Sequence, residues 1–534
     1  MHPRTFPVLT KLRFTNQFVA NLPADSNPRN ETRLVKDACY SFVNPIRATN
    51  PKLVAYSADL ARLLQFSNND CSSDDFLKLF AGNVVSPESK PYATCYGGHQ
   101  FGQWAGQLGD GRAITLGELP GLDNTLYSLQ LKGAGKTPYS RTADGLAVLR
   151  SSLREFVCSE AMYHLRVPTT RALTLILTGD HVVRDMLYDG NPQLEPGAVV
   201  CRVSPTFVRF GNFEILAAQR NTNILGQLAD FVIENHFPEI KTKDRKLRYV
   251  ELFEQVVDRT ALLMSEWYRV GFVHGVMNTD NMSITGLTID YGPYGWIEDF
   301  DLEWTPNTTD ASTKRYRFGQ QNAVAHWNLL QLANALYPLI EDVKLLETAL
   351  HQYPDIYRNY HQSMLVKKLG LTDLNQVNSE FIEELEQCLS LTETDMTLFY
   401  RCLSNPKLLS AEFDGERVSL LREAFYEPDN INESVKLSLE QWLGKLVNIV
   451  NEGQVDPIRR EQSMNNVNPL YVPRNYLAQL VIDEVEKGNF DMLHEWMGVL
   501  QNPYTEQQGK ANFAKKRPEW AKTRVGCSML SCSS

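Results

Sequence analysis

Asparagine and aspartate side chains follow a histidine at fixed spacing between residues 274 and 292. Asn281 lies seven residues after His274, and Asp290 opens the tripeptide Asp290-Tyr291-Gly292 after a short β-like stretch. Amide and carboxylate oxygens are ligands that Mg²⁺ prefers, and a site built from them leaves coordination positions for phosphate oxygens. We therefore predict that Asn281 and Asp290 hold Mg²⁺, with Mn²⁺ as the alternative ion.

The same segment has the residue order of a protein-kinase catalytic loop, in which an asparagine also follows the histidine by seven residues. It departs from that pattern at Val276, where a kinase has its catalytic aspartate. Because a valine side chain cannot accept a proton, ordinary phosphoryl transfer through this position is excluded. Asp280, next to Asn281, is the carboxylate available instead.

A glycine-rich stretch upstream has residues suited to a phosphate loop. Gly106, Gly109 and Gly111 recur within it, and Asp110-Gly111 predicts a hairpin turn. Glycine lets backbone N–H groups approach phosphates without a Cβ clash. The order G-x-x-G-x-G is the reverse of the kinase loop, and a tight structural hairpin would need the same residues.

A lysine and a glutamate follow where a kinase has the ion pair that contacts ATP. Lys132 ends the strand-like segment 126–132, and Glu155 lies in 146–165, whose apolar residues recur at helical spacing. Taken singly, an edge-strand lysine and a solvated helix glutamate are the simpler interpretations. The ordered set of glycines, lysine, glutamate, histidine, asparagine and aspartate favours a nucleotide site.

The run Gly133-Ala134-Gly135-Lys136-Thr137 offers an alternative, because it resembles the end of a Walker A loop. The complete motif needs a glycine five residues before Gly135, and Gln130 stands there, inside the predicted strand. A loop without that glycine is too short to enclose a triphosphate. A true P-loop would make Lys136, rather than Lys132, the phosphate-binding lysine.

The elements that must position these residues form a β-rich part followed by a helical part. This order predicts an α+β protein with a two-lobed, protein-kinase-like fold and extra helical elements at both ends. Residues 1–90 are expected to be irregular with short helices and to pack on the core as an extension. Residues 91–212 are predicted to form the β-rich lobe, and residues 213–500 the helical lobe with the catalytic and metal-binding loop 274–292. Residues 501–534 are expected to form a polar surface tail.

Composition narrows the class of protein. The chain has 534 residues, 43% hydrophobic and 22% charged, which is the balance of a globular protein. Its net charge of −10 argues against binding to nucleic acid or to an anionic membrane, and no apolar run is long enough to span one. Nine scattered cysteines without a CxxC pair favour a reducing compartment. The basic N-terminus lacks an apolar signal region, so we expect a cytoplasmic protein of bacterial type rather than a mitochondrial one.

Longer motifs make the chain similar to the selenoprotein O family of pseudokinases, which are protein adenylyltransferases. These motifs are LRFTNQFVANLPAD, YGGHQFGQWAGQLGDGRA, LQLKGAGKTPYSRTADG, RVSPTFVRFGNFE and VHGVMNTDNMSITGLTIDYGPYG. The resemblance implies a kinase fold that binds ATP in a flipped pose. It implies transfer of AMP to Ser, Thr or Tyr hydroxyls of protein substrates, and we expect a monomer.

The resemblance also implies a role for each matching residue. Asp280 would be the catalytic proton acceptor, with Asn281 and Asp290 on the metal ion. Glu155 would be the ion-pair partner of Lys132. The residues expected to contact the nucleotide are Gly109, Gly111, Arg112, Lys132, Asp144, Gly145, Arg202, Arg209 and Asp290. The two arginines Arg202 and Arg209 would clamp phosphates, and a pair of exposed strand arginines is the competing interpretation.

Members of this family carry a redox residue third from the C-terminus, and Cys532 is at that position. In some members it forms a disulfide with a cysteine of the activation-loop region, but this chain has no cysteine between Cys201 and Cys388. Cys527 is the candidate partner, and a tail thiol without a redox role is the alternative.

Two other functions fit the same residues. A protein uridylyltransferase that uses UTP with Mn²⁺ would need the same phosphate and metal ligands, because no base-reading residue can be recognised in the sequence. A pseudokinase scaffold that binds nucleotide without catalysis would also share them.

Overall fold

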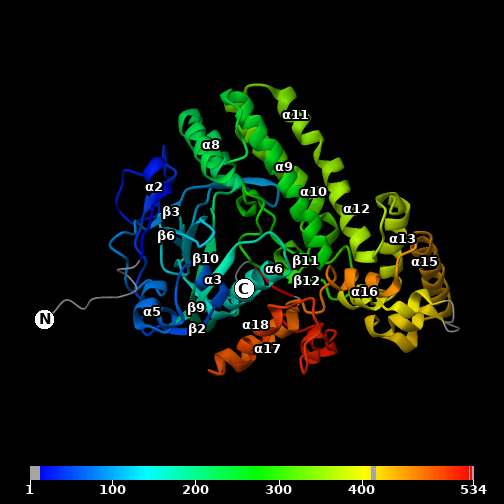
Figure 1. Ribbon diagram of the computed structural model, residues 1–534. Coiled ribbons are helices and arrows are strands. Elements are labelled where there is room, and N and C mark those ends of the chain that lie inside the picture. Colours follow the sequence, from blue (N-terminus) through cyan, green and yellow to red (C-terminus); the bar gives the residue numbers. More distant parts are fainter. Residues whose placement is uncertain (1–11, 411–415, 528, 532–534) are drawn as a thin grey trace.

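A computed structural model describes residues 12–410, 416–527 and 529–531. Its centre is an antiparallel sheet in the order β1-β3-β6-β7-β10-β9-β2, with the short β8 paired to β10. Figure 1 shows this sheet on one side of the molecule and a body of long helices on the other. The strands are β1 (Tyr40–Phe42), β2 (Lys52–Tyr56), β3 (Tyr92–Thr94), β6 (Ala113–Pro120), β7 (Leu126–Lys132), β8 (Ala147–Val148), β9 (Arg171–Arg184) and β10 (Gln193–Ser204), with separate pairs β4 (Gly97–Gln100) with β5 (Gln103–Gln107) and β11 (Phe272–Val273) with β12 (Gly295–Trp296).

The alternation of side chains along β7 places the predicted lysine on one face of the sheet. Leu129 and Leu131 point into the core and are fully buried. Gln130 and Lys132 point to the opposite face, where Gln130 lies across from Arg202 on β10. Because side chains alternate with period two, the register brings these three polar residues to the same face.

The first 90 residues differ from the prediction of an irregular extension. They supply both edge strands of the sheet, since β1 pairs with β3 and β2 pairs with β9. The apolar stretch 53–64 is part strand and part helix, because β2 ends at Tyr56 and a helix begins at Ala58. A sheet edge exposes unpaired backbone groups, and strands from a distant part of the chain satisfy them here.

The α-helices are α2 (Gln17–Asn21), α3 (Ala58–Leu63), α4 (Asn68–Cys71), α5 (Asp74–Phe80), α6 (Leu149–His164), α7 (Phe210–Ala218), α8 (Thr222–His236), α9 (Arg245–Val270), α10 (Gln321–Ile340), α11 (Val343–His351), α12 (Tyr353–Leu369), α13 (Ser379–Ser390), α14 (Met396–Leu403), α15 (Glu433–Glu452), α16 (Pro457–Asn465), α17 (Asn475–Glu486) and α18 (Asp491–Leu500). The mixture of a β-rich part with a helical part agrees with the prediction. The likeness to a two-lobed kinase remains a prediction.

Helix α9 positions the segment that begins at His274. Asp244 caps its N-terminus by accepting a hydrogen bond from Leu247 N at 2.9 Å. The helix ends at Val270, and the C-cap residue Gly271, with a φ of 74°, turns the chain in a left-handed conformation that glycine adopts without a steric cost. The chain then enters β11 at once, and His274 follows that strand. The length of α9 and its C-terminal glycine therefore set where the predicted catalytic loop starts.

The described C-terminal part packs on the β-rich side, so it differs from the predicted polar surface tail, while the predicted boundary at residue 500 stays a prediction. Helices α17 and α18 pack against α6, below the sheet in Figure 1. Phe513, Ala521 and Cys527 join the same hydrophobic cluster, and Leu530 is fully buried. The segment is polar in overall composition, and a few apolar residues within it pack against the rest of the protein.

No helix among the described residues is both long enough and apolar enough to cross a membrane.

Candidate active site

A cavity of about 670 Å³ lies between the sheet and the loop that follows α9. It gathers most of the residues predicted from the sequence: Gly109, Gly111, Arg112, Lys132, Asp144, Gly145, Arg202, Asp280, Asn281 and Asp290. Of the other predicted residues, Glu155 and Arg209 lie behind its wall, and Cys532 falls outside the described residues.

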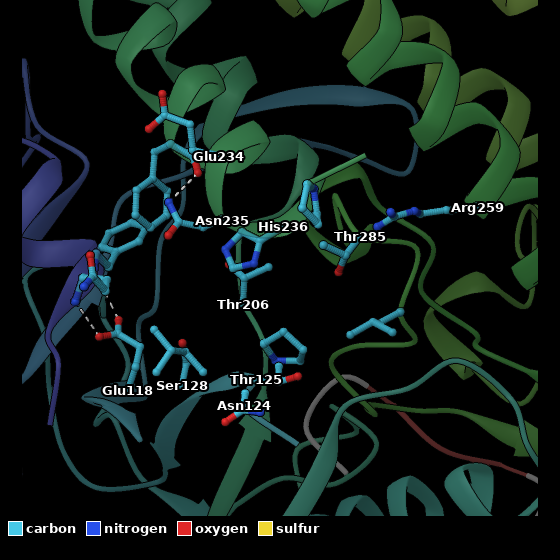
Figure 2. A pocket seen from close by; sticks show the side chains of 17 residues that line it. Glu118, Asn124, Thr125, Ser128, Thr206, Glu234, Asn235, His236, Arg259 and Thr285 are labelled. Carbon is cyan, nitrogen blue, oxygen red and sulfur yellow. Dashed lines mark hydrogen bonds between the residues drawn. The ribbon is translucent and has the colours of Figure 1, made fainter. Parts of the chain in front are cut away.

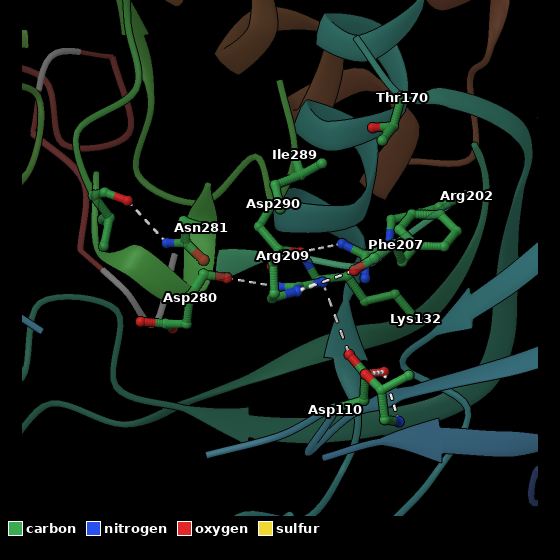
Figure 3. Close-up of polar contacts among 12 residues, drawn as sticks. Asp110, Lys132, Thr170, Arg202, Phe207, Arg209, Asp280, Asn281, Ile289 and Asp290 are labelled. Carbon is green, nitrogen blue, oxygen red and sulfur yellow. Dashed lines mark hydrogen bonds and ion pairs between the residues drawn. The ribbon is translucent and has the colours of Figure 1, made fainter. Parts of the chain in front are cut away.

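Asp290 is the centre of the buried charge network shown in Figure 3. Its two carboxylate oxygens accept hydrogen bonds from Arg202 and from Arg209. Burial alone would raise the pKa of Asp290, but the two guanidinium groups and the nearby ammonium group of Lys132 hold it well below its usual value. The side chain is 21% exposed, so an ionised carboxylate faces the cavity.

Lys132 and Arg202 share the carboxylate of Glu155. Lys132 Nζ donates to Glu155 Oε2 at 2.7 Å, and Arg202 Nη1 lies 3.2 Å from Oε1. This is the ion pair that the order of residues predicted. Burial lowers the pKa of Lys132, which Glu155 opposes. Together with Asp290 and Arg209, the cluster holds three cations against two carboxylates, and this excess of positive charge makes the cavity wall suited to an anionic ligand.

Arg209 differs from its predicted place on a phosphate. It is fully buried and does not line the cavity, because it lies behind Asp290 at the N-cap of α7. Its Nη1 donates to the backbone oxygen of Asp280 at 2.8 Å as well as to Asp290. The residue therefore joins the predicted catalytic loop to the predicted metal ligand. Neither it nor Arg202 is an exposed strand arginine, since Arg202 is 3% exposed.

Asp280 has the carboxylate that is least satisfied in the cavity. It lies in the 3-10 helix η1 (Thr279–Asn281) and is buried. Its Oδ1 has no hydrogen-bond partner among the described residues, and Oδ2 is 3.4 Å from Gln100 Nε2. Burial raises the pKa of Asp280 to about 7, although the charge of Arg209 opposes the shift. A carboxylate with this pKa can take up and release a proton near neutral pH.

The oxygen atoms around Asn281 fit a divalent cation. Asn281 Nδ2 donates to the backbone oxygen of Val276 at 2.8 Å, which leaves the amide oxygen as the free end. Each oxygen of Asp290 keeps a lone pair beyond the one that an arginine uses, and no group in the described part of the chain bonds to Asp280 Oδ1. Hard oxygen ligands of this kind suit Mg²⁺ or Mn²⁺.

His274 holds the backbone that precedes Asp290. Its Nε2 donates to the backbone oxygen of Ile289 at 2.8 Å, and its ring stacks on Trp267. Burial lowers the pKa of His274, so the imidazole is neutral. Asp290 has a φ of 55°, a left-handed conformation that a non-glycine residue adopts only when its surroundings impose it.

The glycine-rich stretch forms its hairpin elsewhere than predicted. The turn between β4 and β5 is at Phe101-Gly102, and Asp110-Gly111 lies in the loop that leads into β6. Gly109 has a φ of 93°, and a Cβ there would come within 2.5 Å of Tyr139. The glycines at 109 and 111 therefore allow the loop to pass close to its neighbour while it faces the cavity.

Asp144 lies at the rim of the cavity and is bound by a residue that the sequence did not single out. Arg184 donates to its two carboxylate oxygens at 2.7 and 2.8 Å. Gly145 has a φ of 76° and packs on the backbone of Gly135, where a Cβ would clash. Asp144 and Gly145 therefore shape the rim of the cavity as well as lining it.

Sequence reasoning missed several lining or supporting residues, among them Gln100, Gln130 and Arg184. Gln130 Oε1 accepts a hydrogen bond from Arg202, so the residue that excluded a Walker A loop orients a phosphate-binding candidate instead. Gln100 was detectable only as a polar residue at a hairpin end. Lys136 is exposed and does not line the cavity, which disfavours the P-loop alternative.

A separate group of Asp59, Glu160 and His164 has metal-like spacing. Arg171 neutralises it, because this guanidinium pairs with Glu160 at 2.5 Å and with Asp59 at 2.9 Å. The group lies on α3 and α6 and shares no residue with the cavity described above. We assign it a structural role.

Figure 2 shows a second cavity, of about 610 Å³, on which none of the predicted site residues lies. Glu118, His236 and Arg259 are among its lining residues. Glu118 accepts hydrogen bonds from the backbone of Gln17 and Phe18, and Arg259 pairs with Glu239. Most of its charged groups are thus already satisfied, and the first cavity is the better candidate.

Comparison with known proteins shows the family to which the chain belongs. Residues 26–501 match the family model described as "Protein adenylyltransferase SelO". Relatives named "Protein nucleotidyltransferase YdiU" include those of Flavobacterium johnsoniae, 51% identical over 98% of this chain and 100% of the relative, Azoarcus sp. strain BH72, 51% identical over 98% and 99%, and Nitrosospira multiformis, 50% identical over 99% and 98%. The protein is therefore an enzyme of the nucleotidyltransferase class. It belongs to the SelO family, which confirms the resemblance seen in the motifs.

Proposed function

We propose that the protein transfers AMP from ATP to a Ser, Thr or Tyr hydroxyl of a protein substrate and releases pyrophosphate. The carrying observation is the buried Oδ1 of Asp280, which has no hydrogen-bond partner within residues 12–410, 416–527 and 529–531, in a cavity whose other wall presents Lys132 and Arg202. A proton acceptor beside a cationic wall suits attack of a hydroxyl on a phosphate.

In the proposed step, the substrate hydroxyl gives its proton to Asp280 while its oxygen forms a bond to the α-phosphorus. The bond from that phosphorus to the bridging oxygen breaks, and pyrophosphate leaves with the electron pair. Lys132 and Arg202 stabilise the charge that builds on the leaving phosphates. A divalent cation held by Asn281 and Asp290 would neutralise phosphate charge further.

The remaining residues support the nucleotide from the cavity wall. Gly109 offers a backbone N–H group and Arg112 offers a guanidinium group, whereas Gly111 N already donates to Gly109 O at 2.8 Å and Gly111 contributes by letting the loop pass close to the cavity. Arg209 is assigned a positioning role through Asp290 and the backbone of Asp280, rather than a direct phosphate contact. We propose that Asp144-Gly145 contacts the nucleotide at the rim and that ATP takes the flipped pose implied by the family resemblance.

The test is mass spectrometry of the full-length protein and candidate protein substrates after incubation with ATP or UTP and either Mg²⁺ or Mn²⁺. We expect a gain of one AMP on a hydroxyl, and loss of this product in Asp280→Asn. Addition of UMP only would make the protein a uridylyltransferase. Nucleotide binding without any covalent product would make it a scaffold, and a gain of phosphate would reject the reaction itself.

A further inference from the structure

Arg315 is an arginine beside the active site whose charge no described acidic side chain neutralises by an ion pair. It lies in the loop between the 3-10 helices η2 (Thr308–Asp310) and η3 (Phe318–Gln320). Its Nε is buried and has no hydrogen-bond partner among the described residues. Arg317, two residues later, shows the ordinary situation, because its Nε pairs with Glu303 at 2.8 Å.

The loop holds this guanidinium in a fixed place. Its Cζ lies 4.7 Å from the ring centroid of Trp327, the distance of a cation–π contact. Asp310, the nearby acid, is fully buried and accepts hydrogen bonds from Arg315 N at 3.0 Å and Tyr316 N at 2.7 Å. Asp310 therefore fixes the backbone of the loop and leaves the guanidinium without a carboxylate.

The turn of the β4–β5 hairpin connects Arg315 with Asp280. A Cβ at Gly102 would lie 3.3 Å from Arg315 Cζ, so the turn rests on the guanidinium. On the other side of the turn, Gln100 Nε2 approaches Asp280 Oδ2. Phe101 N donates to Asn278 Oδ1 at 3.1 Å, and Asn278 lines the cavity. The unpaired charge and the proposed proton acceptor thus flank one short turn.

The same hairpin exposes aromatic side chains. Phe101 is 36% exposed and Trp104 is 41% exposed. Aromatic residues next to an arginine are the side chains that interfaces favour. The chain as a whole has a net charge of −10, so a cation without an ion pair beside exposed aromatic side chains is a local exception that favours an anionic partner.

We propose that Arg315 selects protein substrates in which an Asp or Glu side chain lies close in sequence to the acceptor hydroxyl. The guanidinium binds that carboxylate while the hydroxyl reaches Asp280, and Phe101 and Trp104 contact the substrate segment. The proposal rests on the proposed function and names the substrate class of the same site.

The test compares peptides that share one acceptor hydroxyl and carry acidic, alanine or lysine residues on its flanks. We expect kcat/KM for AMP transfer to favour the acidic peptide by roughly tenfold, mainly through KM. Arg315→Gln should remove the preference while kcat/KM for the alanine peptide and the affinity for ATP stay unchanged. Arg315→Glu should reverse the preference, so that the peptide with lysine flanks becomes the better substrate. Arg317→Gln is the matched control, because its charge is already paired with Glu303.

The outcomes separate this inference from the proposed function. Equal AMP transfer to all three peptides, or an Arg315→Glu variant that does not reverse the preference, rejects the role of Arg315 while the transferase activity stands. If the wild-type protein transfers no AMP at all, the proposed function fails. In that case, calorimetric binding of the acidic and lysine peptides to wild type and Arg315→Glu still decides whether Arg315 recognises an acidic flank.

Discussion

Burial of Asp280 suits its carboxylate to proton transfer and also lowers the stability of the folded protein when that carboxylate is ionised. Its carboxylate is buried without a cation on Oδ1, which raises its pKa to about 7. A neighbouring aspartate, Asp290, has the opposite shift, because two arginines bind it. Two carboxylates in one cavity thus have different charges near neutral pH, which is how an active site separates a proton acceptor from a charged ligand.

We expect the rate of transfer to rise with pH and to level off, because Asp280 must be ionised to accept a proton. The midpoint should fall below about pH 7, because a cation on Asn281 and Asp290 lowers the pKa of about 7 that Asp280 has without metal. The measurement is kcat/KM for AMP transfer between pH 5.5 and 9 at saturating metal. A rate that falls as pH rises through this range would contradict the assignment of Asp280 as the base.

Asp280→Asn should abolish transfer, keep ATP binding and stabilise the fold. The folded-state pKa is above the unfolded value, so stability conferred by the protonated form is lost as pH rises from about 4 to about 7. Asparagine does not ionise, so the variant does not lose this stability. We expect its free energy of unfolding to exceed that of the wild type by a few kcal/mol above pH 7 and by little at pH 4. Thermal unfolding at both pH values measures it.

Asp429→Asn is the control for that experiment, because the Asp429 side chain is 80% exposed. It should leave both activity and melting temperature nearly unchanged. An Asp280→Asn variant with wild-type transfer activity would remove Asp280 from the mechanism.

At the scale of elements, the glycine loop before β6 is shaped by steric contact with a neighbouring segment. Gly109 and Gly106 both have positive φ, at 93° and 74°. Only Gly109 has a neighbour in the way of a Cβ, namely Tyr139, while the space beside Gly106 is open. Alanine substitutions at these two glycines therefore distinguish the effect of a strained backbone, which both positions share, from the effect of a steric clash, which only Gly109 has.

Gly109→Ala should therefore destabilise the protein and weaken ATP binding more than Gly106→Ala does. We expect about 1 kcal/mol for the strained backbone at either site and about 1–3 kcal/mol more at residue 109, where Tyr139 must move. Melting temperature and calorimetric ATP affinity measure the two effects. Equal losses in the two variants would show that the contact with Tyr139 does not shape the loop.

At the scale of the whole molecule, the C-terminal segment joins distant parts of the chain. Leu530 N donates to Pro306 O at 2.9 Å, and Thr308 N donates to Leu530 O at 2.7 Å. Asn307, between them, donates through Nδ2 to Gly275 O at 3.0 Å, beside His274. Cys527 is 1% exposed, and burial raises its pKa to about 11, so its thiol is protonated and a weak nucleophile in this conformation.

Leu530→Ala should lower the free energy of unfolding by about 2–4 kcal/mol, because it leaves a cavity at a fully buried position. Faster proteolytic cleavage of the C-terminal segment should accompany the lower melting temperature. Leu437→Ala is the control, since Leu437 is 60% exposed. An unchanged melting temperature in Leu530→Ala would mean that the segment does not contribute to the fold.

The sequence by itself determined most residues of the candidate site and their local elements. The features that could be predicted are local patterns: the spacing of His274, Asn281 and Asp290, the strand that ends at Lys132, and the helix that carries Glu155. Strand alternation and helical periodicity depend on neighbouring residues only, which is why they can be read without a structure.

Only the tertiary structure decided which charges meet and which stay free. Arg209 and Asp290 are 81 residues apart, and their contact removed Arg209 from the cavity surface. The strands from the first 90 residues, the docking of Leu530 and the unpaired guanidinium of Arg315 arise in the same way. Burial and ion pairing depend on groups that folding brings together from distant positions, and no local pattern of residues records them.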